Sequence, residues 1–436
     1  MKTLAPFLQC TLKSELIFRG ELMMKERIVL TPQYLGKFQC IGPKCEDNCC
    51  YGWKVIIDEK MHKKYKKVSD IELKTLISKN ITRNRSNPSI ENYSKIKMNS
   101  EGNCPFLCED KLCDMQKKLG VGYLSKVCMT YPRISNVLNG FYEKSLTFSC
   151  PEAVRVALLN PKLMEFDEFE ENIEVQNIIM KEINTTNIKY SNKIQKHFWD
   201  LRVFTITLLQ NRNYELWERL IVLGLFFQKV QSFIGEQYLI EIPNLLERYN
   251  KSIEDGSIRN GLENIPTNMA IQMQLMKELN DERLSRGINL NSMPYVQCMS
   301  EFLEGIQYTS EATVEEVVDR YKEAYEKYYL PFMQEHEFIL ENFLVSHVFT
   351  DMFPIISKEG VFEDYVKLIV HYGIIKMMLI GMSAYHKKLD EDMIVRLIYS
   401  FSRAIDSSNT FLVRIFKLLN DKGFNTMPYM AILIKN

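Results

Sequence analysis

The stretch Cys40–Trp53 reads CIGPKCEDNCCYGW and carries four cysteines with the spacing C-x4-C-x3-C-C. The residues between them include glycine, proline, aspartate and asparagine, which turn the backbone, so short irregular loops bring several thiols towards one point. Adjacent residues of a strand point to opposite faces, so Cys49 and Cys50 share a centre only if the loop folds tightly; otherwise they serve different centres. Thiolates select zinc or iron–sulfur clusters among biological metals. The stretch therefore predicts a loop-rich metal-binding module.

Further cysteines follow this stretch at wider spacing. The chain has 11 cysteines, and eight of them lie between positions 40 and 128. Cysteines that act only as small buried hydrophobic residues would be scattered through the chain. The later group has no histidine partners, and the spacing distinguishes neither zinc from iron–sulfur nor one centre from two. The candidate metal ligands are Cys40, Cys45, Cys49, Cys50, Cys104, Cys113, Cys128 and Cys150, whereas Cys10 and Cys298 fall outside the set.

Composition and charge exclude several other classes of protein. The 436 residues include 55 Lys+Arg and 55 Asp+Glu, so no bulk charge favours nucleic acid or an anionic membrane as the partner. The apolar segments 216–234 and 366–385 are interrupted by charged residues, so we expect core helices and no stable membrane insertion. The apolar patch at 4–8 contains a proline and is too short for the core of a signal peptide. We therefore expect a reducing, cytoplasmic location.

Cysteine content and apolar periodicity divide the chain into parts. We predict a mainly α protein, in which residues 24–160 form a Cys-rich, loop-rich N-terminal metal-binding module and residues 194–436 form an all-helical C-terminal domain. An acidic linker is expected at 161–193, and residues 1–23 are read as an extension that precedes the module. Within the module, helices are expected at 59–67 and 71–79, with Asp58 and Asp70 as their N-caps.

Several motifs of the chain resemble the flagellin lysine-N-methylase family, whose members carry a Cys-rich zinc- or iron-chelating module that ends in a Cys-Cys pair. The matching pieces are LTPQY at 30–34, FQC at 38–40, CEDNCCYGW at 45–53, RSNP at 85–88, NCPFL at 103–107, LC at 112–113, CMTYPR at 128–133, LTFSCPEA at 146–153, ENFLV at 341–345 and MFP at 352–354. The resemblance covers nearly all of residues 24–436. Cys108 stands where the family has an acidic residue, so it is not taken as a ligand.

This resemblance implies a cytoplasmic protein methyltransferase that acts on flagellin before export. It implies an iron–sulfur cluster, which we expect to be 4Fe-4S with zinc as the alternative. It also implies S-adenosylmethionine as the methyl donor and lysine ε-amines of flagellin as the acceptors. The residues alone leave two other classes open, an electron-transfer protein with a redox cluster and a zinc-stabilised interaction module without chemistry.

Methylation of a lysine requires the neutral amine, and removing its proton at neutral pH costs about 4 to 5 kcal/mol. A carboxylate or a tyrosine near the thiols could accept that proton, so Asp47 and Tyr131 are catalytic candidates and Glu46 is a further one. Each of them also fits an ordinary role in a loop or core. Arg133 follows a Tyr-Pro turn and is a candidate for binding the carboxylate of S-adenosylmethionine, although a structural ion pair explains it equally well.

The usual signature of a nucleotide-binding methyltransferase is absent from the sequence. The Gly-Val-Gly run at 120–122 lacks the apolar strand that precedes a glycine-rich phosphate-binding turn. If S-adenosylmethionine binds, a cluster iron without a cysteine ligand is the expected holder of its amino and carboxylate groups.

Overall fold

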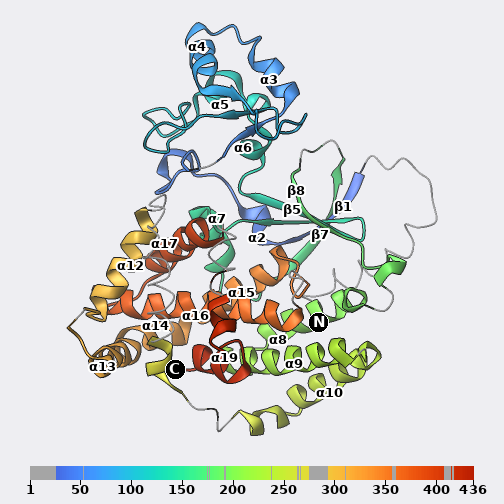
Figure 1. The fold of residues 1–436 in the computed structure, drawn as a ribbon, viewed down its shortest axis with the longest axis vertical. Helices are drawn as coiled ribbons and strands as arrows, with labels where there is room; N and C mark the ends of the chain where they lie inside the picture. Colours follow the sequence, from blue (N-terminus) through green and yellow to red (C-terminus); the bar gives the residue numbers. More distant parts are fainter. Residues whose placement is uncertain are drawn as a thin grey trace.

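The computed structural model describes residues 26–52, 54–173, 175, 177–190, 193–236, 238–262, 265, 267–273, 293–309, 311–355, 360–406, 414 and 417–436. Residues 1–23, for which an extension was predicted, lie outside this set, as does Cys10. Figure 1 shows a small unit at the top, a sheet below it to the right, and a layer of helices that fills the lower part of the molecule.

A five-stranded mixed sheet with the order β7-β1-β6-β5-β8 forms the centre of the N-terminal half. Its strands are β1 (Glu26–Pro32), β5 (Arg133–Leu138), β6 (Phe141–Leu146), β7 (Phe166–Asn172) and β8 (Ile179–Ile183). The hairpin of β5 and β6 turns through Asn139 and Gly140, which both have positive φ, as a two-residue hairpin turn requires. Strand β1 then pairs parallel with β6 and antiparallel with β7.

Residues 161–193, expected to be an acidic linker, supply both edge strands of this sheet. Strand β7 pairs with the whole of β1, from Glu26 opposite Asn172 to Pro32 opposite Phe166. Phe166 is buried and its ring lies 5.1 Å from that of Phe349, whereas the acidic residues of the strand are exposed or half-buried. The acidic composition therefore belongs to a solvent-facing sheet edge, where charged side chains are common, and the linker expectation is corrected.

The small unit at the top of Figure 1 has a hydrophobic core of its own, separate from the main one. It contains α3 (Glu59–Tyr65), α4 (Ile71–Asn80), α5 (Asp114–Leu119), α6 (Lys126–Thr130) and a sheet of β2 (Ile56–Ile57), β4 (Ser94–Ile96) and β3 (Ile81–Arg83). The carboxylate of Asp58 accepts from the backbone N–H of Met61 at 2.7 Å, and that of Asp70 accepts from Leu73 at 2.8 Å. Both predicted N-caps are confirmed.

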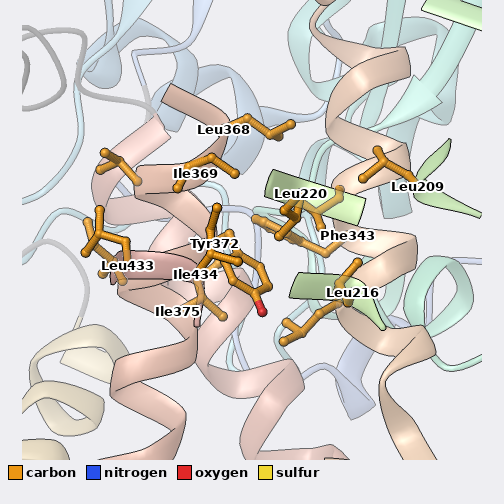
Figure 2. Packing of buried hydrophobic residues seen from close by; sticks show 14 of the residues in the cluster. Leu209, Leu216, Leu220, Phe343, Leu368, Ile369, Tyr372, Ile375, Leu433 and Ile434 are labelled. Carbon is orange, nitrogen blue, oxygen red and sulfur yellow. The ribbon is translucent and has the colours of Figure 1, made fainter. Parts of the chain in front are cut away.

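The remaining helices enclose the main hydrophobic core. They are α2 (Tyr34–Lys37), α7 (Pro151–Leu158), α8 (Phe198–Leu209), α9 (Leu216–Glu236), α10 (Ile242–Glu254), α12 (Met293–Gly305), α13 (Val314–Ala324), α14 (Leu330–His336), α15 (Phe338–Thr350), α16 (Val361–His386), α17 (Glu391–Phe401) and α19 (Met427–Ile434). Figure 2 shows Tyr372 and Ile375 of α16 in the same cluster as Leu216 of α9 and Ile434 of α19. The protein is thus mainly α, as predicted, with a sheet in its N-terminal half.

Helix α16 lies at the middle of this core. Among the described residues it is the one helix long and apolar enough to cross a membrane by length and composition. Of its most apolar window, 94% is buried inside the protein, and it packs against α9, α12 and α19. The helix is therefore packed as the core helix that the sequence predicted at 366–385.

A buried ion pair joins the sheet to the helices. Arg202 on α8 donates to both carboxylate oxygens of Glu143 on β6, at 2.6 and 3.0 Å, and also to the carbonyl of Phe349 at 2.7 Å. The exposed fractions of the two charged side chains are 0% and 1%. Because neither charge has access to water, each depends on the other, and removal of one leaves the second buried without its counter-charge.

We expect Arg202→Met to lower the free energy of unfolding by about 3 to 5 kcal/mol, because it leaves the Glu143 carboxylate buried without its counter-charge. The double variant Arg202→Met, Glu143→Leu should recover most of this loss, since both charges are then gone. Urea unfolding followed by circular dichroism measures both. As a control, Glu59→Ala removes an exposed pair with Lys63 and should change stability by less than about 1 kcal/mol. Equal losses in the single and double variants would contradict the account.

Lys376 on α16 is a buried lysine in an apolar setting. Its ammonium donates to the carbonyl of Ile434 at 2.8 Å and lies 5.9 Å from the ring centroids of Tyr325 and Tyr372. Burial lowers the pKa of Lys376 to about 7, with the charge of Glu337 acting in the opposite direction. Between about pH 7 and pH 10 the unfolded chain therefore binds a proton that the folded protein does not, so this residue makes stability rise with pH across that window.

We predict that Lys376→Met raises the free energy of unfolding at pH 7 by about 3 kcal/mol, the desolvation penalty less one lost hydrogen bond. The gain should shrink towards pH 10, where the unfolded lysine also loses its proton. Unfolding of both proteins at the two pH values tests this, with the exposed Lys74→Met as the control. A gain of equal size at both pH values would refute the assignment of the effect to the buried charge.

Candidate metal centre

The loop that carries the first cysteines is shaped by its turn residues. Gly42 has φ 56° and begins a short 3-10 turn that ends at Lys44, and the backbone N–H of Cys45 donates to the Gly42 carbonyl at 3.0 Å. The side chain of Asn48 accepts from the backbone N–H of Cys50 at 2.8 Å. The residues that predicted an irregular loop thus make the hydrogen bonds that shape it.

One group of thiols gathers where this loop meets the segment 103–113. Its members lie near enough to one another that ionisation of one thiol raises the pKa of a neighbouring one, and they are Cys49, Cys50, Cys104, Cys113 and Cys128. The backbone N–H of Cys104 donates to the Cys50 carbonyl at 2.8 Å, and a bridge pairs Leu107 with Cys113. The thiols of Cys49 and Cys50 are hydrogen-bonded to each other, so both adjacent residues belong to this group. We call these five residues the five-thiol group.

A second group of thiols lies against the main body of the protein. Cys40 and Cys45 lie near enough to Cys150 that ionisation of their thiols raises its pKa. Cys150 is buried in the main core and is the N-cap residue of α7. The thiol of Cys45 donates to the carbonyl of Asp47 at 3.3 Å. The eight predicted ligands therefore divide into the five-thiol group and this three-thiol group, while Cys298 lies apart beside Ser400.

The chemistry of the five-thiol group fits a soft metal or an iron–sulfur cluster. All ten cysteines of the described residues are free thiols. Burial raises the pKa of Cys104 to about 12 and that of Cys128 to about 11, so without a metal both are neutral at pH 7. Within the described part of the chain, no three Cys, His, Asp or Glu side chains converge closely enough to hold one ion. The structure thus supplies a sulfur donor set without a closed coordination sphere.

A guanidinium from the helical half reaches the loop between the two thiol groups. Arg403 lies in the short π-helix Ser402–Asp406 that follows α17, and its Nη1 lies 2.7 Å from Asp47 Oδ1. Its Nη2 donates to the Asp47 carbonyl at 3.2 Å, and its Nε donates to the Ser149 carbonyl at 2.8 Å. The sequence prediction missed Arg403, because nothing in its neighbourhood resembles a ligand or an anion-binding motif.

Arg403 brings the two catalytic candidates of the sequence together. Tyr131 is hydrogen-bonded to Arg403, and its hydroxyl lies 3.3 Å from Ser149 Oγ. Burial raises the pKa of Tyr131, so its hydroxyl stays protonated at neutral pH. Burial also raises the pKa of Asp47, although the charge of Arg403 opposes that rise.

The other two candidates have contacts of their own. Glu46 forms an ion pair with Arg155 of α7. Arg133 is exposed at the start of β5, with its guanidinium carbon 5.3 Å from the centroid of the Phe38 ring.

Comparisons with known proteins match both halves of the chain. The family model described as FliB lysine N-methylase C-terminal domain matches residues 202–433, slightly more than half of the chain. Lysine-N-methylases of Salmonella typhimurium and Salmonella choleraesuis are each 26% identical over 388 residues, which is 87% of this chain and 92% of each relative. The flagellar biosynthetic protein FliU of Salmonella muenchen is 38% identical over 146 residues, 33% of this chain and 85% of that protein. No solved structure matches the chain.

We predict that replacing Cys104, Cys113 or Cys128 by serine lowers the metal bound per chain by more than half, because each change removes a soft donor from the five-thiol group. Cys298→Ser should leave the metal content unchanged, since that thiol is buried among α12 and α17. Elemental analysis of anaerobically purified variants measures this. Full metal content in all three variants would show that the five-thiol group is not the centre.

Proposed function

Since the chain belongs to the FliB lysine N-methylase family and is a lysine N-methyltransferase, we propose that it methylates lysine ε-amines of flagellin with S-adenosylmethionine as donor and a thiol-ligated iron–sulfur cluster as cofactor. The single observation that carries the cofactor part is the gathering of five free thiols from three separate segments beside a buried arginine. A cytoplasmic setting, before flagellin is exported, suits free thiols.

The five-thiol group is the better holder of the cluster. A cubane cluster takes up to four thiolates, which five residues can supply, whereas the three-thiol group has one too few to close a zinc site. Three of Cys49, Cys50, Cys104, Cys113 and Cys128 would bind it and leave one iron without a cysteine ligand. When bound, an iron without a cysteine ligand would supply a place for the amino and carboxylate groups of the methyl donor. Because burial keeps the thiols of Cys104 and Cys128 protonated at neutral pH, metal binding by them would release protons and strengthen as pH rises.

The residues around Arg403 suit the removal of a proton from the acceptor lysine. A carboxylate whose pKa is raised accepts a proton more readily than an ordinary one, so Asp47 is our candidate for the base. Tyr131 stays protonated at neutral pH, so it would act as a hydrogen-bond partner to the amine and not as a base. Its neighbour Ser149 offers a second hydroxyl at the same place.

Flagellin as the acceptor is supported by the names of the relatives. The FliU relative is described as a flagellar biosynthetic protein, and its match covers a third of this chain. The formal net charge of the chain is zero, so no long-range field steers a lysine-bearing substrate towards it. Recognition of a cationic acceptor would then depend on carboxylates close to the site, of which Asp47 is one.

The test combines the acceptor and the cofactor. Anaerobically purified protein should be brown with broad visible absorption, whereas a zinc protein is colourless. Incubation with flagellin and S-adenosylmethionine should add mass increments of one methyl group to flagellin lysines, measured by mass spectrometry. We expect the double variant Cys49→Ala, Cys50→Ala to lose both the bound iron and at least about 100-fold of the transfer rate, as for loss of a metal ligand. Cys298→Ala is the matched control and should retain both.

Two results would contradict the proposal. Methyl transfer that persists after complete loss of iron would remove the cluster from the reaction. If flagellin lysines stay unmodified when incubated with intact, iron-loaded protein, flagellin is not the acceptor. The lysine methyltransferase would then act on another protein.

A further inference from the structure

We propose that Arg403 is a positioning residue that holds the thiols of two chain segments in place from the helical half of the protein. Any consequence of this positioning for methyl transfer rests on the function proposed above, whereas the positioning of the thiols itself does not. The guanidinium of Arg403 contacts Asp47, which lies between Cys45 and Cys49, and Ser149, which directly precedes Cys150. One side chain thus ties members of both thiol groups to the same element.

Arg403 and one of the thiols donate hydrogen bonds to the same acceptor atom. The carbonyl oxygen of Asp47 accepts from Arg403 Nη2 at 3.2 Å and from the Cys45 thiol at 3.3 Å. If the guanidinium is lost, the carbonyl is released and the turn between Cys45 and Cys49 loses its contact with the helical half. The loop then keeps the ion pair of Glu46 with Arg155 of α7 and its local hydrogen bonds, such as that from the Cys50 N–H to the Asn48 side chain.

The geometry requires an arginine at this position. Three nitrogen atoms donate in different directions to two segments that are far apart in the sequence, Asp47 and Ser149. A lysine is a single point charge and satisfies only one of these acceptors well, whereas the planar guanidinium serves all of them at once. The side chain of Arg403 is 10% exposed, so water replaces few of these bonds when they are broken.

The position of Arg403 also couples the thiols to the rest of the fold. The π-helix Ser402–Asp406 directly continues α17, and α17 packs against α7, the helix whose N-cap residue is Cys150. Arg403 lies within residues 202–433, which match the C-terminal domain of the family. The helical part of the protein therefore takes part in organising a thiol group whose members all lie in the N-terminal half.

Site-resolved alkylation of the metal-free protein tests the placement directly. We expect Arg403→Met to raise the iodoacetamide reaction rates of Cys45, Cys49 and Cys150 about tenfold or more, once each rate is divided by the thiolate fraction measured in a pH series; this is the change that follows loss of at least one charged hydrogen bond. The division is needed because the charge of Arg403 lowers the pKa of Cys45 and Cys49, so its loss alone reduces their thiolate fraction. The rates of Cys104, Cys113 and Cys128 should change little, because Arg403 touches none of their segments among the described contacts. Arg403→Lys, which keeps the charge, should give intermediate rates and guards against failure of the first variant to fold.

Arg396 provides the matched control. It lies on α17 two turns before Arg403, is half-buried, and pairs with Glu301 of α12 instead of a thiol-bearing segment. Arg396→Met should leave the alkylation rates of all these cysteines unchanged. Elemental analysis should show metal loss in Arg403→Met, partial retention in Arg403→Lys and full retention in Arg396→Met.

Two outcomes would overturn the inference: unchanged rates in both Arg403 variants, or an equal rise at every cysteine, which would mark general loosening of the fold. Selective exposure of Cys45, Cys49 and Cys150 would support it even if flagellin were not methylated by the wild-type protein. Failure of the proposed function is therefore distinguishable from failure of this inference.

Discussion

The ion pair between Arg403 and Asp47 is the constraint on which the arrangement of the thiols depends. The segment from Phe38 to Cys50 contains no helix or strand except a single 3-10 turn, so its local hydrogen bonds fix little of its path. A guanidinium on a well-packed helical element fixes that path from outside. Because the same guanidinium holds Ser149, the loop, the start of α7 and the end of α17 form one junction, and the five-thiol group lies beside it.

This junction contacts segments of both thiol groups, whose surroundings differ. Cys104 of the five-thiol group packs in the small core of the N-terminal unit, whereas Cys150 packs in the main core that the helices enclose. The sheet and the helices are themselves held together by the buried pair of Glu143 and Arg202. A soft metal bound by the five-thiol group would therefore lie close to the contact between the small unit and the main hydrophobic core, where Asp47 and Tyr131 both contact Arg403.

The sequence predicted local features well and long-range ones poorly. Asp58 and Asp70 were predicted as N-caps because a cap needs only its own helix, and the Cys-Cys pair marked the thiol loop because its turn residues are adjacent to it. The edge strands of residues 161–193 were missed, since acidic residues on an exposed strand resemble those of a linker until β1 is known to pair with them. Arg403 was missed for the same reason: its partner Asp47 is 356 residues away, and no local pattern reports such a contact.

X-ray absorption at the metal edge of the anaerobically purified protein tests the central claim, that the gathered thiols form a metal centre, most directly. The account predicts iron with a first shell of sulfur atoms and a second shell of iron, because every donor of the five-thiol group is a cysteine. A sulfur-only shell around zinc would keep the thiol centre and replace the iron–sulfur assignment. A first shell dominated by nitrogen or oxygen, or a protein that holds no metal, would contradict the account.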